Sequence, residues 1–427
     1  MPLHEATLSN GLRVLVMPLA VHRVALSLFV RVGSRFETPA VNGISHFLEH
    51  MLFRGTPSLA SSHEQALAFE ELGGTLFAST HVDHGLLSVS VPPNNLKGVL
   101  PLLAEVVSKP HFSDIEIERG IVREEILEDL DENGRQVEAD NLVRALMYAD
   151  HALGLPITGT LETLGRFSRG MLAEYHARHY AADNARLCVA GCISNPNEVL
   201  RLLEYHFNNM PRGRRITSEA PSNGQRKPRF RFIENQSSQT DLRVAFRALC
   251  EHDPREPAVE MLLRVLDDGM STRLYERICD RAGLCYDVSA SFETYEDDGV
   301  FDIAAGTQHA RAHRVLEEVF KIVRDLASHG PSQAELTKAL NRHHWSVESM
   351  QDDPEATAGF FGLASLANIA LTPEARHQEL ARVTAADVRA AAQVIFRPEK
   401  LSVVAVGLLE TAEQESMAAA VRRFSLR

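Results

Sequence analysis

The chain contains an internal repeat, which limits its possible folds more than any other feature. Residues 161–191 align without gaps to residues 377–407, an offset of 216 positions. Each stretch reads as a helix cap (Ser168 or Thr384), a helix, a short turn and an apolar strand that ends in Gly. Two unrelated helix–strand units are the alternative, because that arrangement is common. The alignment favours a duplicated fold with two similar halves.

A basic stretch rich in Pro, Gly and Ser lies near the middle of the chain and predicts a linker at residues 213–228. It separates two expected repeats, 1–212 and 229–427, within 427 residues.

A hydrophobic content of 44% with 24% charged residues is typical of globular proteins. The net charge of −13, with both signs mixed along the chain, argues against nucleic acid and anionic membranes as partners.

The sequence shows no targeting or membrane signal. No stretch approaches the length of apolar sequence that spans a bilayer. The N-terminus lacks a basic region followed by an apolar one, so we expect a cytoplasmic protein, with a periplasmic location open if a leader was removed. The five cysteines are odd in number and form no zinc-knuckle spacing, which indicates free thiols in a reducing compartment.

The motif His46-Phe47-Leu48-Glu49-His50 predicts a zinc site on a helix. Each helical residue advances about 100°, so His50 lies roughly 40° from His46, and Glu49 roughly 60° to the other side. Two imidazoles one turn apart suit one Zn²⁺, with a carboxylate beside the open coordination position. The order inverts the usual His-Glu-x-x-His, as in inverzincins. The alternative is a helix with two ordinary histidines and a solvated Glu. We expect Asn42 to cap this helix.

Two histidines need a third protein ligand. A helix expected at 114–130 offers Glu118, Glu124 and Glu125. Glu118 and Glu125 are two turns apart and share a face, and Glu124 lies about 100° away from it. One carboxylate can complete the site while another orients a histidine, although a solvated acidic face is the alternative. Residues 229–427 contain no second His-x-x-Glu-His, so we expect one half to be metal-free.

These motifs resemble those of the pitrilysin/insulysin family, which includes the mitochondrial processing peptidases. In that family the His-x-x-Glu-His motif precedes a Glu-Arg…Glu-Glu-Ile segment. Residues 118–126 match this segment, and 74 residues separate His50 from Glu125. The resemblance implies that Glu125 is the third zinc ligand and that Glu118 lies in the second shell, where it orients a ligand histidine. It also implies an α+β fold of two homologous repeats, each a mostly antiparallel sheet covered by helices. Such a chain forms half of a clamshell chamber.

The resemblance also implies residues that contact the substrate. The family binds substrate backbone along the strand that follows Gly-Gly, which here comprises Phe77, Ala78, Ser79 and Thr80. Phe77-Ala78 stands where the family usually has Asn-Ala, and this is a departure from the pattern.

A second departure lies in the second half of the chain. Active family members carry an Arg and, seven residues later, a Tyr that faces the substrate carbonyl. Tyr286 matches the Tyr, but Cys279 occupies the Arg position. Arg277 and Arg281 flank Cys279 on other helix faces. Either one of them substitutes, or another chain supplies the pair.

Together these features predict a zinc endopeptidase that hydrolyses unfolded peptides. His46, His50 and Glu125 are expected to hold Zn²⁺, and Glu49 is expected to act as general base on a metal-activated water. Tyr286 is the expected oxyanion donor. We expect a dimer, and more specifically a heterodimer with a homologous subunit that bears the Arg/Tyr pair. The alternative function is a non-catalytic peptide-binding or structural subunit of a larger complex.

Overall fold

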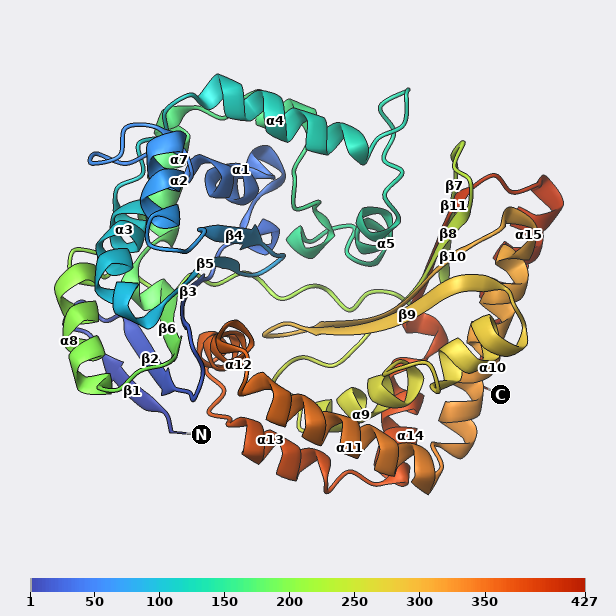
Figure 1. Ribbon diagram of the computed structural model, residues 1–427. Coiled ribbons are helices and arrows are strands. Elements are labelled where there is room, and N and C mark those ends of the chain that lie inside the picture. The colour runs from blue at the N-terminus through green and yellow to red at the C-terminus, as the bar shows by residue number, and fades with distance from the viewer. Residues whose placement is uncertain (1, 427) are drawn as a thin grey trace. The chain divides into compact units, whose positions relative to one another are not determined.

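The strands form two sheets, one in each unit of the computed structural model, which describes residues 2–426 (Figure 1), and apolar runs such as β3, β6 and β11 are fully buried. The six-stranded sheet has the order β1-β2-β6-β3-β5-β4, and the five-stranded sheet has the order β7-β11-β8-β10-β9. The first sheet comprises β1 (His4–Thr7), β2 (Arg13–Pro18), β3 (Val24–Val30), β4 (Phe77–Thr80), β5 (Gly85–Val91) and β6 (Ala185–Gly191). The second comprises β7 (Arg229–Glu234), β8 (Thr240–Arg247), β9 (Cys285–Thr294), β10 (Gly299–Thr307) and β11 (Leu401–Gly407).

The two sheets share one topology, which confirms the internal repeat. Strand β2 pairs in parallel with β6, as β7 does with β11, and the strands that follow are antiparallel in both sheets. The aligned elements obey the offset of 216 to the residue: α7 (Arg169–His179) corresponds to α14 (Ala385–Ile395), and β6 to β11. The side chains of Ser168 and Thr384 both cap their helices. The predicted α+β fold with two homologous repeats is therefore confirmed.

Helices cover the sheets. In the unit that contains the first sheet they are α1 (Ile44–Met51), α2 (Ser62–Glu70), α3 (Leu96–Ser108), α4 (Ile115–Glu128), α6 (Leu161–Leu164), α7, α8 (Pro196–Phe207) and α12 (Pro354–Leu366). In the other unit they are α5 (Ala139–Met147), α9 (Glu256–Leu266), the π-helix Tyr275–Arg281, α10 (Ala312–His329), α14 and α15 (Thr411–Arg422). Helices α11 (Gln333–Met350) and α13 (Pro373–Leu380) contain the boundaries between the units.

Each half of the chain contributes one helix to the sheet of the other half. Helix α5 packs on β8 and β11, whereas α12 packs on β3 and β6. The compact units are consequently not contiguous. One holds the chain up to Glu128 with 155–219 and 346–373, and the other holds 129–154, 220–345 and the chain from Glu374. The contiguous repeats predicted at 1–212 and 229–427 differ from these units, because sequence order does not reveal which sheet buries a helix.

Side-chain packing explains where the two exchanged helices lie. Ala358, Phe361 and Leu366 of α12 join a buried cluster with sheet residues. Gly362 permits the close approach, because a Cβ there would lie 2.2 Å from the ring of Phe29. On α5, Arg144 donates hydrogen bonds to Tyr295 at 2.8 Å and to Glu293 at 2.6 Å, which ties the helix to the end of β9 and the turn after it. Apolar contact holds α12, and a charged network adds to the contacts of α5.

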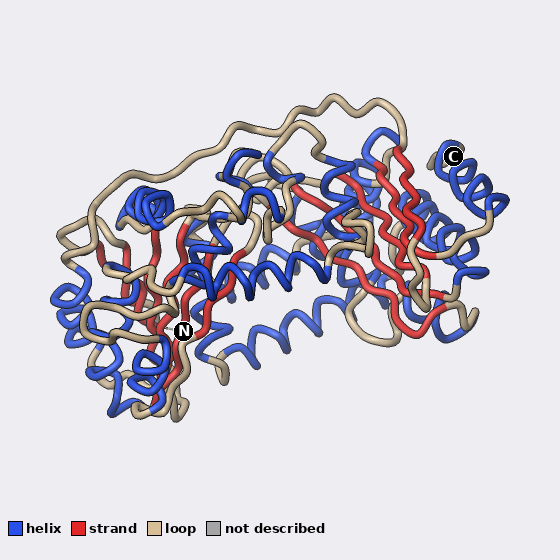
Figure 2. Tube along the Cα trace, turned by 90° about the horizontal axis from the view of Figure 1, so that it is seen from above, coloured by secondary structure: helices blue, strands red, loops and turns tan. Residues whose placement is uncertain are grey.

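The predicted linker at 213–228 has no regular secondary structure. Loop segments of this kind are drawn in tan in Figure 2. No helix within residues 2–426 has the length and apolar character needed to cross a membrane.

The Glu335→Gln variant is expected to be less stable at neutral pH. Arg273 donates to both oxygens of Glu335, at 2.6 and 2.9 Å, and to Asp325 at 2.8 Å. Burial opposes ionisation of Glu335, but Arg273 and Ser332 outweigh it and lower its pKa to about 2. The folded pKa is below the unfolded value, so this contribution is complete above about pH 4.5 and is lost as the pH falls toward 2. The shift sets an upper bound of about 3 kcal/mol.

Urea unfolding of wild type and Glu335→Gln at pH 7, 5 and 4 measures this contribution. The difference in free energy of unfolding should be largest at pH 7 and smaller at pH 4. Glu415→Gln, at an exposed position of α15, is the matched control and should change little. An equal destabilisation at every pH would contradict the ion-pair explanation.

Candidate metal centre

Helix α1 separates an apolar face from a polar one. Ile44, Phe47, Leu48 and Met51 are buried, which anchors the helix in the core. The motif residues His46, Glu49 and His50 lie outside that apolar set, as the helical spacing predicts.

The prediction that Asn42 caps this helix is wrong. The carboxylate of Glu37 accepts hydrogen bonds from the backbone N–H groups of Gly43 and Ser45, both at 2.8 Å. Asn42 instead donates from its side-chain amide to Glu37 and to the carbonyl of Pro156. A buried carboxylate from the preceding turn therefore satisfies the helix start, which agrees with the preference of helix N-termini for negative charge.

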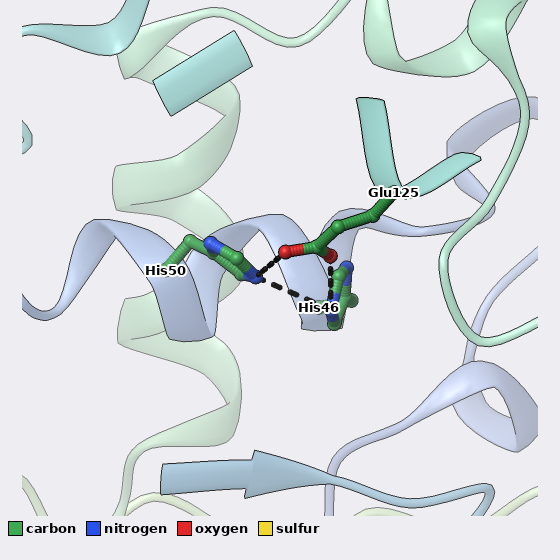
Figure 3. A group of neighbouring side chains, drawn as sticks. All are labelled: His46, His50 and Glu125. Carbon is green, nitrogen blue, oxygen red and sulfur yellow. Dashed lines mark hydrogen bonds and ion pairs between the residues drawn. The ribbon is translucent and has the colours of Figure 1, made fainter. Parts of the chain in front are cut away.

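His46, His50 and Glu125 converge, with Glu125 reaching from α4 toward α1 (Figure 3). The two histidine Nε2 atoms are 3.3 Å apart, and they lie 3.4 Å (His46) and 3.5 Å (His50) from the two oxygens of Glu125. Ligand atoms at about 2.0–2.1 Å from a tetrahedral zinc would be about 3.4 Å from one another. One ligand atom from each of the three side chains lies within 4.8 Å of the other two, so the three residues can bind one metal ion together. Within residues 2–426 no other group of His, Cys, Asp or Glu has such a spacing.

The three candidate carboxylates of α4 have different environments. Glu125 points to the histidines, and Glu124 pairs with Arg123 with 72% of its side chain exposed. Glu118 lies 2.8 Å from Nδ1 of His50 and also forms an ion pair with Arg54. A His50 that donates from Nδ1 to Glu118 presents the lone pair of Nε2 to the centre, which is the usual support for a metal-binding histidine.

The charges around the centre favour a cation. Burial, reinforced by the neighbouring His50, lowers the pKa of His46 to about 3, so its imidazole is neutral and its lone pair available. Burial would also lower the pKa of His50, but the hydrogen bond with Glu118 and the charges of Glu125 and Glu49 outweigh it and raise that pKa. Burial opposes ionisation of Glu118 as well, yet His50 and Arg54 hold its pKa below the usual value. The donor set therefore fits zinc in both geometry and charge.

Glu49 is held beside this centre by the edge strand of the first sheet. Thr80 of β4 donates its hydroxyl hydrogen to a carboxylate oxygen of Glu49 at 2.7 Å. Burial raises the pKa of Glu49, although the Thr80 hydrogen bond and His50 oppose the rise. A raised pKa brings a carboxylate closer to the range in which it can both accept and return a proton at neutral pH.

Strand β4 contains the four residues predicted to bind substrate: Phe77, Ala78, Ser79 and Thr80. It pairs with β5 and is the last strand of the sheet on that side. Phe77 is 56% exposed. Among the described residues, β4 therefore has no strand neighbour on its outer edge.

Tyr286 and Cys279 lie in the other compact unit. Tyr286 is 93% exposed near the start of β9. Cys279 lies on the π-helix, with its sulfur near that of Cys285. The flanking arginines have partners of their own: Arg277 pairs with Glu318 at 3.3 Å, and Arg281 with Glu276 at 2.5 Å.

Two contacts at the centre were missed by reasoning from the sequence. Arg54 forms an ion pair with Glu118. Its position four residues after His50, about one helical turn, could have indicated that it lies near the partner of His50. No sequence pattern indicated the hydrogen bond from Thr80 to Glu49, because the two residues are 31 positions apart and only the folded sheet brings them together.

The family model described as insulinase, peptidase family M16, matches residues 14–161, and the model described as the peptidase M16 inactive domain matches 166–342. An uncharacterized zinc protease of Bacillus subtilis, YmxG, is 31% identical over 348 residues, which cover 80% of this chain and 82% of that protein.

Solved structures show the same fold. The structure of a peptidase M16 inactive domain from Pseudomonas fluorescens matches with a TM-score of 0.87 at 22% identity, covering 95% of this chain and 98% of that one. The periplasmic protease PqqL of Escherichia coli matches with a TM-score of 0.78 at 20% identity, covering 99% of this chain but 51% of PqqL.

Proposed function

This chain belongs to the M16 (insulinase) family of peptidases, and we propose that it is a zinc-dependent endopeptidase that cleaves unfolded peptides. The observation that carries the proposal is the convergence of His46, His50 and Glu125, whose ligand atoms lie within 4.8 Å of one another, with the carboxylate of Glu49 on the same helix as the two histidines. The name of the Bacillus relative, a zinc protease, supports the choice of metal.

The chain's own residues supply the proton transfers. A zinc ion held by His46, His50 and Glu125 would polarise the scissile carbonyl and lower the pKa of the attacking water. Glu49 accepts the proton from that water and then donates it to the leaving amine. Thr80 restrains the Glu49 carboxylate during both transfers, and Glu118 orients His50.

Substrate peptide is proposed to bind along the open edge of β4. An extended peptide can add as a further strand there, through backbone hydrogen bonds to residues 77–80. Backbone pairing carries little information about side chains, so it suits many unfolded sequences. Because β4 also holds Thr80 against Glu49, a peptide on this edge would lie next to the proposed general base.

The active form is proposed to be a heterodimer. PqqL is about twice as long as this chain, so a second chain of similar fold would make up the missing half. Tyr286 is the proposed oxyanion donor, but a thiol at position 279 cannot replace the five fixed N–H donors of Arg. A homologous subunit that carries both residues would complete the site.

The purified homomer is therefore expected to have little peptidase activity. Cys279→Arg should raise it, by up to about 10²–10³-fold, if the guanidinium restores an oxyanion donor. Cleavage of an unstructured peptide mixture with added zinc, followed by mass spectrometry, measures this. Cys192→Arg, at an exposed position, is the matched control. Strong activity of the unmodified homomer that Arg281→Ala abolishes would refute the need for a partner.

A non-catalytic, peptide-binding subunit is the second candidate function. The absence of Arg at position 279 favours it, because a binding subunit needs no oxyanion donor. The match to the inactive-domain model covers 166–342 and so leaves out the metal centre, which lies in the part matched by the insulinase model. A binding subunit would retain peptide affinity yet show no cleavage in any assembly, including the Cys279→Arg form.

A further inference from the structure

The sulfur atoms of Cys279 and Cys285 lie 3.6 Å apart. Cys279 is on the π-helix, and Cys285, six positions later in the chain, is the first residue of β9. A disulfide requires the sulfur atoms to approach to about 2.05 Å, so the two side chains must move together from this separation. The other free cysteines, Cys188, Cys192 and Cys250, have no such neighbour among the sulfur contacts of residues 2–426.

The backbone holds the two cysteines in this arrangement. Gly283 takes a positive φ of 57° at the end of the π-helix, a conformation that glycine adopts readily. The N–H of Gly283 donates to the carbonyl of Cys279 at 3.1 Å, and the N–H of Leu284 donates to that of Ile278 at 2.9 Å. The chain therefore folds back on itself between the two thiols.

Contacts from neighbouring elements secure the same turn. Thr307 of β10 donates its hydroxyl hydrogen to the carbonyl of Leu284 at 2.6 Å, and Arg311 donates to the carbonyl of Gly283 at 2.7 Å. Preorganisation of this kind lowers the conformational cost of closing a covalent ring.

The two thiols remain accessible to a small reagent. Both are only partly buried at the rim of the core, whereas Cys188 is fully buried. Burial raises the pKa of Cys279, and burial with the neighbouring thiol raises that of Cys285 to about 12. The thiolate fraction is therefore small at neutral pH, which makes thiol exchange slow but does not prevent it.

We propose that Cys279 and Cys285 are a reversible redox pair that closes to an intramolecular disulfide by exchange with a low-molecular-weight disulfide such as oxidised glutathione. One cysteine, as its thiolate, attacks the glutathione disulfide, forms a mixed disulfide and releases one glutathione thiolate, which takes up the proton. The second cysteine then attacks the protein-bound sulfur and expels the second glutathione. Two protein thiols are oxidised while one glutathione disulfide is reduced to two thiols, and the reverse sequence reopens the pair.

The disulfide would join the π-helix covalently to β9 at the residue before Tyr286. Residues 279–285 would become a closed ring, so the segment that leads into Tyr286 would lose conformational freedom. A consequence for catalysis rests on the proposed function, whereas the redox chemistry itself does not depend on it.

Thiol mapping of the purified full chain tests the redox pair. The protein is incubated at pH 8 in glutathione buffers of increasing oxidised fraction, free thiols are alkylated, and peptides are identified by mass spectrometry. The expected product has 279 and 285 cross-linked and neither of them alkylated, with the two joined peptides together lighter by two hydrogens than their reduced forms, and dithiothreitol should restore both thiols. A chain that stays reduced at both positions while the exposed Cys192 gains glutathione would overturn the proposal. So would stable glutathione adducts on Cys279 and Cys285 without a cross-link.

Matched variants separate the pair from the other thiols. Cys279→Ser and Cys285→Ser should each lose the cross-link and keep a glutathione adduct on the remaining cysteine, because no second thiol resolves it. Cys192→Ser and Cys250→Ser should form the cross-link as wild type does. Loss of the cross-link in Cys250→Ser would assign the chemistry to another pair. If a Ser variant fails to fold, the mapping of wild type decides alone.

Discussion

The Glu49→Gln variant should keep its metal and lose peptide hydrolysis by about 10²–10⁴-fold, the range measured for loss of a general acid–base group. Gln has nearly the shape of Glu and can still accept the hydrogen bond that Thr80 donates to Glu49, so the local structure should survive. It cannot take a proton from the attacking water. The variant therefore separates chemistry from metal binding.

The measurement pairs initial rates of peptide cleavage with metal content, in the most active form available, either the Cys279→Arg chain or a complex with a homologous subunit. Glu70→Gln, at the exposed end of α2, removes the same charge and should leave both unchanged. Activity of Glu49→Gln within about tenfold of its parent would show that another group moves the proton. Loss of metal as well as activity would assign Glu49 a role in the metal centre itself.

His50→Ala should abolish zinc binding. The purified chain is expected to hold about one zinc, since three protein ligands with an open position are typical of catalytic zinc sites. Removing His50 leaves His46 and Glu125 as two ligands and also deprives Glu118 of its histidine partner. Two protein ligands hold zinc too weakly to survive dialysis, so metal and peptidase activity should disappear together.

Metal analysis after dialysis, with zinc titration against a competing chelator, measures the change. Glu118→Gln should keep the three ligands but weaken zinc binding by about 10–100-fold, the usual effect of losing the carboxylate that hydrogen-bonds to a ligand histidine. Glu124→Gln is the control, because Glu124 is adjacent to Glu125 but mostly exposed. Full zinc occupancy in His50→Ala, or equal losses in Glu118→Gln and Glu124→Gln, would contradict the proposed ligand set.

The pattern of residues was enough to predict what depends on local geometry. The separation of His46 and His50 by four residues places both on one face of any α-helix, whatever surrounds it. The offset of 216 between α7–β6 and α14–β11 needed only that both copies repeat the same caps and apolar strands. These features depend on contacts within a few residues, which is why the sequence alone determined them.

Contacts between distant segments were decided only by the tertiary structure. Helical spacing alone did not choose between Glu118 and Glu125, which share a face, and only the family resemblance implied Glu125 as the ligand. The packing of α4 against α1 brings Glu125 to the two histidines and Glu118 to Nδ1 of His50. Packing likewise brought Thr80 to Glu49 and exchanged α5 and α12 between the sheets. The spacing of residues along the sequence predicts which face of a helix or strand each side chain occupies. It does not predict which other element packs against that face, because this depends on how whole helices and sheets bury their apolar surfaces.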